Sequence, residues 1–226
     1  MKQIPILFED GEALVIDKPA GLPMDRPRRG GASLDDHLID LRLGFQRDPS
    51  PVHRLDTDTS GCLLLARNPK ALSRFARAFE DRLVEKTYLG VLAGELGEEE
   101  GTIELALSKI SSAEKGWRMI PARKGKPALT HWRRLMVHDG LTLVEFRPLT
   151  GRTHQIRVHA AAGLGIPLLG DPVYGPVYGP VYGHSDPRSS RTLLHASALI
   201  VPRAGKPAIC ATAPLPDTFR ALGLHG

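Results

Sequence analysis

The sequence predicts an α+β protein whose sheet is mostly antiparallel, and three features of the chain support this class. Short apolar runs of strand length recur along the 226 residues. Several are joined by turn sequences, such as residues 9–12 and Asp139-Gly140, which are typical of hairpins. Few runs follow the strand–helix–strand order of a parallel sheet. A single domain over residues 1–226 is therefore expected, with helices and loops flanking a central sheet.

The apolar runs predict the strands of this sheet. The first two runs form one hairpin, and the runs on either side of Asp139-Gly140 form another. In chain order we expect strands at 4–8, 13–17, 62–66, 87–92, 102–107, 128–137, 141–147, 196–201 and 208–212.

Helix signals separate these runs, and each predicted helix has a start or stop residue. Ser33 and Asp36 suit a capping box, and Asn68-Pro69 suits a helix start. Gly163 suits a stop for a helix that Thr150 or Gly151 would cap. The predicted helices are 34–43, one starting at 68–69, about 152–162, and about 217–222.

Composition narrows the function classes. The formal net charge of +5 and the pI near 9.4 favour an acidic partner such as nucleic acid, although a basic protein with no such partner fits equally well. Cys62 and Cys210 both lie in apolar runs and are expected to be buried. Because there is no Cys-x-x-Cys pair and no third cysteine, neither a zinc site nor a disulfide framework is indicated. The N-terminus lacks the apolar core of a signal peptide, and no run approaches the ~20 residues of a membrane span. We expect a cytoplasmic monomer that does not bind membranes.

The densest polar cluster is HRLDTDTSG, residues 53–61, which precedes an apolar strand. In an extended segment Arg54 and Asp56 would share a face. A carboxylate beside a guanidinium stays ionised, so Asp56 could act as a nucleophile or base. The alternative is a surface ion pair that closes a turn.

A second cluster, LTGRTHQIRVH, spans residues 149–159. Arg152, His154 and Gln155 would lie in the first helical turn, where an anion is favoured. That anion could be a phosphate or the carboxylate of Asp56. Arg157 and His159 would extend the basic surface, and the alternative is an ordinary exposed helix start.

Residues 115–134 hold seven basic residues, no acid, and the two tryptophans Trp117 and Trp132. Basic side chains attract phosphate and aromatic rings stack on bases. The alternative is a solvated basic hairpin with Trp132 in the core. PVYG occurs three times between Pro172 and Gly183, which predicts an expanded surface loop at 172–183.

Two other kinds of site are possible for this sequence, a phosphatase site at Asp56 and a metal site formed by histidines. Asp56-Thr57-Asp58-Thr59 matches the DxDxT pattern of magnesium-dependent phosphatases. However, His53 and Arg54 occupy the place of the apolar strand those enzymes need, and Asp171 has no second acid beside it to hold magnesium. The histidines do not have metal-binding spacing either. No metal site is therefore predicted.

Taken together, HRLDTDTSG, KTYLGVLAG and LTGRTHQIRVHAAAGLGIPLLGDPVYG resemble the RluA family of pseudouridine synthases. EDGEALVIDKPAGLPM, GKPALTHWRRL and LLHASAL fit the same family, in the same order along the chain. The resemblance implies a mixed, mostly antiparallel sheet with an RNA-binding cleft. It implies the catalytic domain alone, because the catalytic pattern begins within the first ten residues and no S4 RNA-binding domain precedes it.

The resemblance also assigns roles to individual residues. Asp56 matches the catalytic aspartate, Tyr88 the active-site tyrosine that packs on the base, and Arg152 the basic residue that pairs with the aspartate. Arg54 matches an arginine that enters the RNA stack in place of the flipped uridine. Ile156 matches an apolar position that lines the pocket. Without the resemblance, Tyr88 in its half-buried strand would more simply be a core residue.

Lys18 and His53 complete the expected substrate-binding set. Lys18 either contacts a phosphate or ends a turn. The resemblance implies isomerisation of particular uridines in structured RNA, transfer RNA or 23S ribosomal RNA, with no cofactor. A catalytically silent RNA-binding protein on the same fold stays open as an alternative, with the magnesium-dependent phosphatase more remote. Which of Tyr174, Tyr178 and Tyr182 takes the family position is also open.

Overall fold

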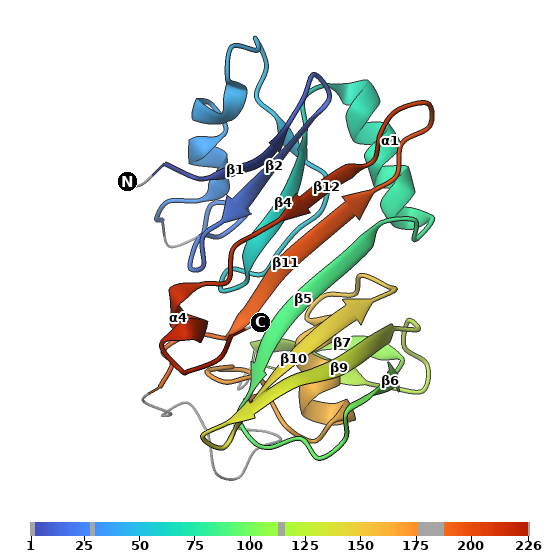
Figure 1. The fold of residues 1–226 in the computed structure, drawn as a ribbon. Helices are drawn as coiled ribbons and strands as arrows, with labels where there is room; N and C mark the ends of the chain where they lie inside the picture. The colour runs from blue at the N-terminus through green and yellow to red at the C-terminus, as the bar shows by residue number, and fades with distance from the viewer. Residues whose placement is uncertain (1–2, 28–29, 113–115, 176–187, 226) are drawn as a thin grey trace. The chain divides into compact units, whose positions relative to one another are not determined.

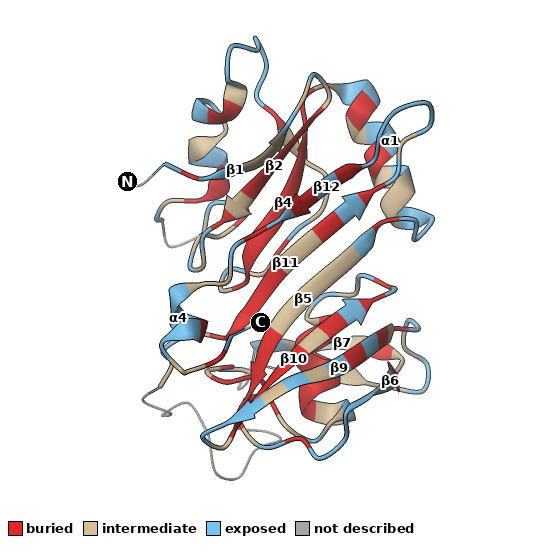
Figure 2. Cartoon of the chain, in the orientation of Figure 1, coloured by how far each residue is buried: buried red, intermediate tan, exposed pale blue. Residues whose placement is uncertain are grey.

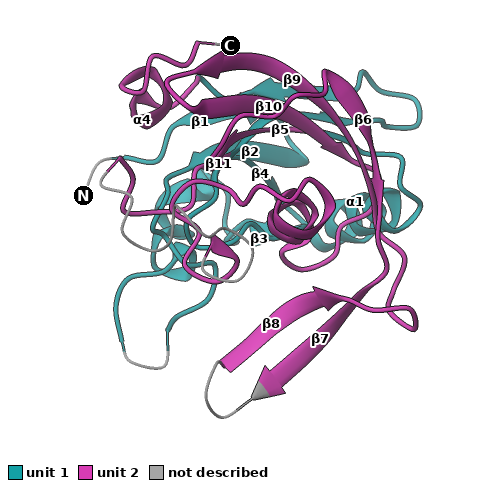
Figure 3. Cartoon of the chain, turned by 90° about the horizontal axis from the view of Figure 1, so that it is seen from below, with its two compact units in different colours: residues 1–86, 195–214 teal, residues 87–194, 215–226 magenta. Residues whose placement is uncertain are grey.

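The computed structural model describes residues 3–27, 30–112, 116–175 and 188–225. The chain divides into two compact units, which Figure 3 colours separately. Unit 1 comprises residues 1–86 and 195–214, and unit 2 comprises residues 87–194 and 215–226. The repeat loop expected at 172–183 lies mostly outside the described residues, which resume at 188.

Unit 1 is built on a mixed sheet, as expected, with the strand order β1-β2-β4-β11. All its neighbouring pairs are antiparallel except β4 and β11, which run parallel, while β12 pairs with β11 and β3 with β4. Every residue of β4 is buried, which Figure 2 shows as an unbroken red strand. The strands are β1 Ile6–Glu9, β2 Ala13–Lys18, β3 Ser50–Pro51, β4 Ser60–Ala66, β11 Leu194–Val201 and β12 Ile209–Thr212.

One predicted helix of unit 1 is confirmed and one is corrected. Helix α1 (Pro69–Glu80) begins where expected, and the Asn68 side chain accepts the Ala71 N–H at 2.9 Å. The predicted helix 34–43 is instead two 3₁₀ turns, η1 (Leu34–His37) and η2 (Asp40–Arg42). The expected contact at its start is present, because the Asp36 carboxylate accepts the Ser33 N–H at 2.9 Å.

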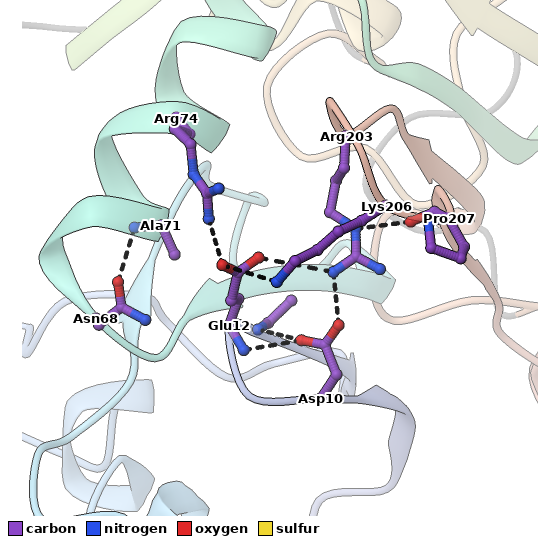
Figure 4. A network of polar contacts seen from close by, with 9 residues as sticks. Asp10, Glu12, Asn68, Ala71, Arg74, Arg203, Lys206 and Pro207 are labelled. Atoms are coloured by element: carbon purple, nitrogen blue, oxygen red, sulfur yellow. Dashed lines mark hydrogen bonds and ion pairs between the residues drawn. The ribbon is translucent and has the colours of Figure 1, made fainter.

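Ion pairs tie the β1–β2 turn to two other segments of unit 1 (Figure 4). Glu12 Oε1 lies 2.7 Å from Arg74 of α1 and 3.1 Å from Lys206 of the β11–β12 turn. Asp10 pairs with Arg203 at 2.5 Å and accepts the N–H groups of the turn itself. This contact set lies at the Ala66 end of β4, whereas Asp56 precedes the Ser60 end, so it serves the architecture rather than the site.

Unit 2 contains an antiparallel sheet with the order β5-β10-β9-β6 and a separate hairpin, β7-β8 (Figure 1). The turn between β9 and β10 is the predicted Asp139-Gly140, and both residues have positive φ, 49° and 70°. The strands are β5 Glu85–Leu92, β6 Glu100–Glu104, β7 Leu107–Ser112, β8 Gly116–Pro121, β9 Leu129–His138 and β10 Leu141–Pro148.

The long helix predicted at 152–162 is shorter and irregular. Helix α2 runs over Gln155–Val158 and continues as a π-turn, η3, over His159–Gly163. It starts late because His154 adopts a left-handed conformation with φ 53°. Arg152 and His154 therefore precede the helix, and the predicted stop at Gly163 is correct. The C-terminal helix α4 covers Asp217–Arg220, and its Phe219 is fully buried.

The two cysteines differ in environment. Cys62 is buried in β4, where its Sγ lies 3.7 Å from two backbone carbonyls and burial raises its thiol pKa to about 12. Cys210 is exposed, contrary to expectation, because alternate residues of the edge strand β12 face solvent. In the part of the chain that the structure describes, no helix is long and apolar enough to cross a bilayer.

Candidate active site

The segment before Asp56 extends the pairing of β3 with β4. Val52 N–H donates to the Leu64 carbonyl at 3.0 Å, and Leu64 N–H donates to Nε2 of His53, also at 3.0 Å. The imidazole thus takes the place of a backbone acceptor. Its ring stacks on Phe79 of α1 with centroids 4.7 Å apart. His53 therefore fastens the start of HRLDTDTSG to the sheet.

Burial fixes the charge state of His53. Burial, together with the smaller effect of the nearby Lys86 ammonium, lowers the pKa of the ring to about 3. The ring is neutral at pH 7 and, because Nε2 accepts a hydrogen bond, its proton lies on Nδ1. These contacts give His53 an architectural role. A contact of His53 with substrate stays a prediction.

Asp56 opens a tight turn between two fixed neighbours. Its carbonyl accepts the Thr59 N–H at 3.1 Å, with Thr57 and Asp58 at the centre of the turn. Leu55 on one side is 3 % exposed, whereas Asp56 itself is half-buried. The backbone is anchored at both ends of this turn, and Asp56 lies half-buried between them. Asp58 is thus a turn residue.

Lys18 anchors the same turn from β2. Its side chain is fully buried, and Nζ donates to the carbonyls of Pro19, Leu22 and Thr57 at 2.9, 2.8 and 3.0 Å. All three ammonium protons are therefore directed at backbone oxygens. These hydrogen bonds make Lys18 an anchor of the turn, and a contact of Lys18 with phosphate stays a prediction.

Gly61 and Ser60 fix the other end of the turn to β11. Ser60 Oγ lies 2.9 Å from Nδ1 of His195, and both residues are buried. Gly61 has φ 104°, and a Cβ there would lie 2.2 Å from the carbonyl oxygen of Ala196. Only glycine tolerates this conformation and this close approach. Ser60 and Gly61 of the motif thus serve the parallel pairing of β4 with β11.

Arg54 faces solvent next to this anchored turn. Its guanidinium is 72 % exposed and lies 3.4 Å from the equally exposed Asp25. An ion pair of this kind contributes at most about 1 kcal/mol, so it is easily broken. The sequence pattern had suggested Asp56 as its partner on the same face. The Arg54 side chain is therefore exposed and only weakly held.

Unit 2 holds Tyr88 and Ile156 in one apolar cluster. Tyr88 lies on β5 opposite Phe146 of β10, and its half-buried ring packs against the cluster. Ile156 belongs to the same cluster from α2 and is 6 % exposed. The fold thus brings together two residues that are 68 positions apart in the sequence.

Gln155 holds the backbone that carries Arg152. Its Oε1 accepts the Arg152 N–H at 2.9 Å and the Thr150 hydroxyl at 2.8 Å. Its Nε2 donates to Leu129 and Thr130 of β9, each at 3.0 Å. The buried amide therefore makes all four of its hydrogen bonds. Arg152 itself donates from Nε to the Pro127 carbonyl at 3.2 Å.

Arg157 and His159 do not form the basic surface expected of them. Arg157 makes a buried two-point ion pair with Asp171, with distances of 2.7 and 2.8 Å. His159 is fully buried, and burial lowers its pKa to about 4. Asp171, the acid that a phosphatase would need to bind magnesium, is thus paired with Arg157. This removes the support for that alternative.

The structure also identifies a residue whose role the sequence left open. Tyr174 is 1 % exposed, and its hydroxyl accepts the Met119 N–H at 3.0 Å and lies 2.9 Å from Nδ1 of His154. Its backbone N–H donates to Asp171 at 3.0 Å. Of the three repeat tyrosines, it is the one within the described residues. In the sequence, the three-residue spacing between Asp171 and Tyr174 is the feature that could have identified this tyrosine.

Comparison with known proteins gives a consistent result. The family described as RNA pseudouridylate synthase matches residues 12–162. An uncharacterized RNA pseudouridine synthase of Zymomonas mobilis is 53% identical over 96% of each chain. The ribosomal large subunit pseudouridine synthase D of Nitrosomonas europaea is 37% identical over 97% of this chain. The chain spans 64% of that second relative.

Solved structures show the same fold. Human RNA pseudouridylate synthase domain containing 1 is similar with a TM-score of 0.74 and 32% identity, covering 95% of this chain and 84% of that chain. Human RNA pseudouridylate synthase domain containing 4 gives 0.78 and 26%, covering 98% and 94%. The mixed, mostly antiparallel fold expected from the sequence is therefore confirmed.

Proposed function

The chain belongs to the RluA-type family of RNA pseudouridine synthases, and from this premise we propose that it isomerises specific uridines in structured RNA with Asp56 as the catalytic carboxylate. The observation that carries this proposal is the anchoring of the Asp56 turn. His53, Lys18 and Gly61 fix the backbone around a carboxylate that is itself half-buried. A reacting group must be held in this way to be effective.

The reaction needs no redox partner. The N1–C1′ bond of uridine breaks, the base rotates, and C5 bonds to C1′ while the C5 proton is lost and N1 regains one. The Asp56 carboxylate would either attack C1′ or remove the 2′ proton, and each route uses an ionised carboxylate. No cofactor is required by either route.

The remaining residues would act on the same uridine. Tyr88, in its apolar cluster, would pack on the base and accept or relay the C5 proton. Ile156 would line the base pocket, and exclusion of water there would retain the detached base. Arg152 would pair with the carboxylate, and the exposed Arg54 would fill the gap left by the flipped uridine.

The substrate is proposed to be transfer RNA, 23S ribosomal RNA or both. The Nitrosomonas relative is described as a ribosomal large subunit pseudouridine synthase, and so is a Rickettsia bellii relative that is 36% identical. These names favour ribosomal RNA without excluding transfer RNA.

The test maps pseudouridines in both RNAs from a strain that lacks the protein, with wild type or Asp56→Ala restored from a plasmid. We expect at least one site to disappear, to return with wild type, and to stay absent with Asp56→Ala. Restoration of the site by Asp56→Ala would refute the proposed catalytic role. If no site disappears, a catalytically silent RNA-binding protein becomes the better description.

A further inference from the structure

A basic arm extends from unit 2, made of β7, β8 and the turn that follows them, residues 107–112 and 116–126. Figure 3 shows its two strands projecting from the rest of that unit. The arm is closed at its base, where Leu107 and Lys126 exchange two backbone hydrogen bonds of 2.9 Å. Leu107 and Met119 pack into the core there, so the arm is a fixed part of unit 2 rather than a loose loop.

The described residues of the arm carry positive charge, and the one acid in its sequence, Glu114, lies outside them. Its described residues include no acid, and no ion pair between described residues involves its basic side chains, which are Lys109, Arg118, Arg123, Lys124 and Lys126. Elsewhere the arginines are mostly paired, for example Arg133 with Glu145 and Arg134 with Glu99. Unpaired cations on a projecting hairpin are what a polyanion requires.

The two tryptophans have separate roles. Trp132 is 7 % exposed in the core, as the hairpin alternative expected, whereas Trp117 on the arm is 45 % exposed. The Trp117 ring lies 4.8 Å from the His154 ring and 4.8 Å from Lys109 Nζ. A large exposed indole among cations is suited to stack on a nucleotide base.

We propose that the basic arm binds single-stranded RNA, with a base stacked on Trp117 and the phosphates held by the arm's lysines and arginines. This proposal depends on the proposed function, because it assumes that the substrate is RNA. The Lys109–Trp117 contact does not prevent stacking, because a stacked base stabilises an exposed indole more than an exposed cation–π contact does. The displaced ammonium is then free to contact phosphate.

The arm is connected to Arg152 at two points. Trp117 contacts His154, two residues after Arg152, and the Tyr174 hydroxyl bonds both His154 and Met119 of the arm. Pro127, next to the arm's base, accepts a hydrogen bond from Arg152. RNA held by the arm would therefore have a fixed position relative to Arg152.

The first test measures binding of a fluorescent 20-nucleotide oligouridylate over a range of salt concentrations. The triple variant Arg123→Gln/Lys124→Gln/Lys126→Gln should bind about tenfold more weakly at 50 mM salt, and its slope of log affinity against log salt should be smaller by about 2. A matched triple variant of exposed residues in unit 1, Arg47→Gln/Lys70→Gln/Arg82→Gln, makes the same charge change. Equal losses in the two triple variants would overturn the proposal.

The second test follows tryptophan fluorescence. Oligouridylate should quench the wild type, and the quenching should disappear in Trp117→Ala, which retains only the buried Trp132. The affinity of Trp117→Ala should fall about tenfold, and Trp117→Phe should restore most of it. Undiminished quenching in Trp117→Ala would refute the stacked base.

The binding tests and the mapping of pseudouridines in the strain that lacks the protein separate the two proposals. If the arm variants lose RNA affinity but no pseudouridine site disappears in that strain, the proposed function is wrong and the arm proposal is right. If mapping succeeds but the arm variants bind normally, only the arm proposal fails.

Discussion

The Nζ atom of Lys18 lies 3.0 Å from the carbonyl oxygen of Thr57, the residue that follows Asp56. The same carbonyl accepts the Gly21 N–H at 2.9 Å, so the loop after β2 and the turn that carries Asp56 share one oxygen. A buried ammonium thus helps to position the candidate catalytic turn. This contact suggests how stability and activity are linked in unit 1.

Replacing Lys18 by methionine should destabilise the protein by about 2 kcal/mol or more, because buried carbonyls lose a charged donor. Activity should fall further than RNA binding, since the Asp56 turn loses one of its anchors. Urea unfolding and uridine-isomerisation assays measure the two effects. Lys70→Met, at an exposed position on α1, is the control and should match the wild type. Equal stability of the two variants would contradict the anchoring role.

Asp56→Ala should abolish pseudouridine formation and leave RNA affinity largely intact, because the residue acts in chemistry rather than in holding RNA. Asp58→Asn should retain most activity, since asparagine suits the same turn position. Tritium release from uridine labelled at C5 measures the activity of both. Full activity in Asp56→Ala would exclude it as the catalytic group.

Gly61→Ala should destabilise the protein by about 3 kcal/mol or more, because the added Cβ would lie 2.2 Å from a backbone oxygen at φ 104°. Thermal unfolding measures the loss. Gly11→Ala has open space around it and should be nearly neutral. A mild effect at Gly61 would mean that β4 and β11 can separate without cost.

Asp171→Ala should cost about 3–5 kcal/mol, because it leaves the guanidinium of Arg157 buried without its partner. Asp217→Ala, which removes the exposed partner of Arg220, is the comparison and should change the unfolding midpoint very little. Guanidinium unfolding of the two variants distinguishes a buried from an exposed ion pair. Similar midpoints would show that Arg157 finds another partner.

The pH dependence of stability should reflect His53. Its folded pKa of about 3 lies below the ordinary 6.5, so the unfolded chain binds a proton that the folded chain does not. The stabilisation is complete above pH 6.5 and is lost progressively as the pH falls towards 3. His53→Gln, whose amide can accept the Leu64 N–H, should lose less stability between pH 7 and pH 4. His225→Gln, at the exposed C-terminus, should follow the wild type.

Local features of the fold were predictable because neighbouring residues determine them. The Asp139-Gly140 turn requires two residues that accept positive φ, and Asn68 with Pro69 supplies both a cap acceptor and a fixed φ. The family motifs also singled out Asp56, Tyr88 and Arg152. Their catalytic roles stay proposals.

Features that depend on distant residues were not predictable in the same way. The helix expected from about 152 begins at Gln155, where the amide is engaged by β9. Arg157 was expected on the surface, but Asp171 makes its burial favourable. A helical pattern gives the spacing of side chains and does not give the partner that each will meet.

HRLDTDTSG also combines features set by neighbouring residues with features set by distant ones. The sequence alone determined that this stretch is a polar loop before an apolar strand and that Asp56 is its candidate catalytic group. Tertiary structure decided that His53 and Lys18 anchor the backbone of this stretch, and that Gly61 allows the close approach of Ala196. The reason is physical: the free energy of a buried histidine, lysine or glycine depends on which atoms lie 3 Å away, and those atoms come from other segments of the chain.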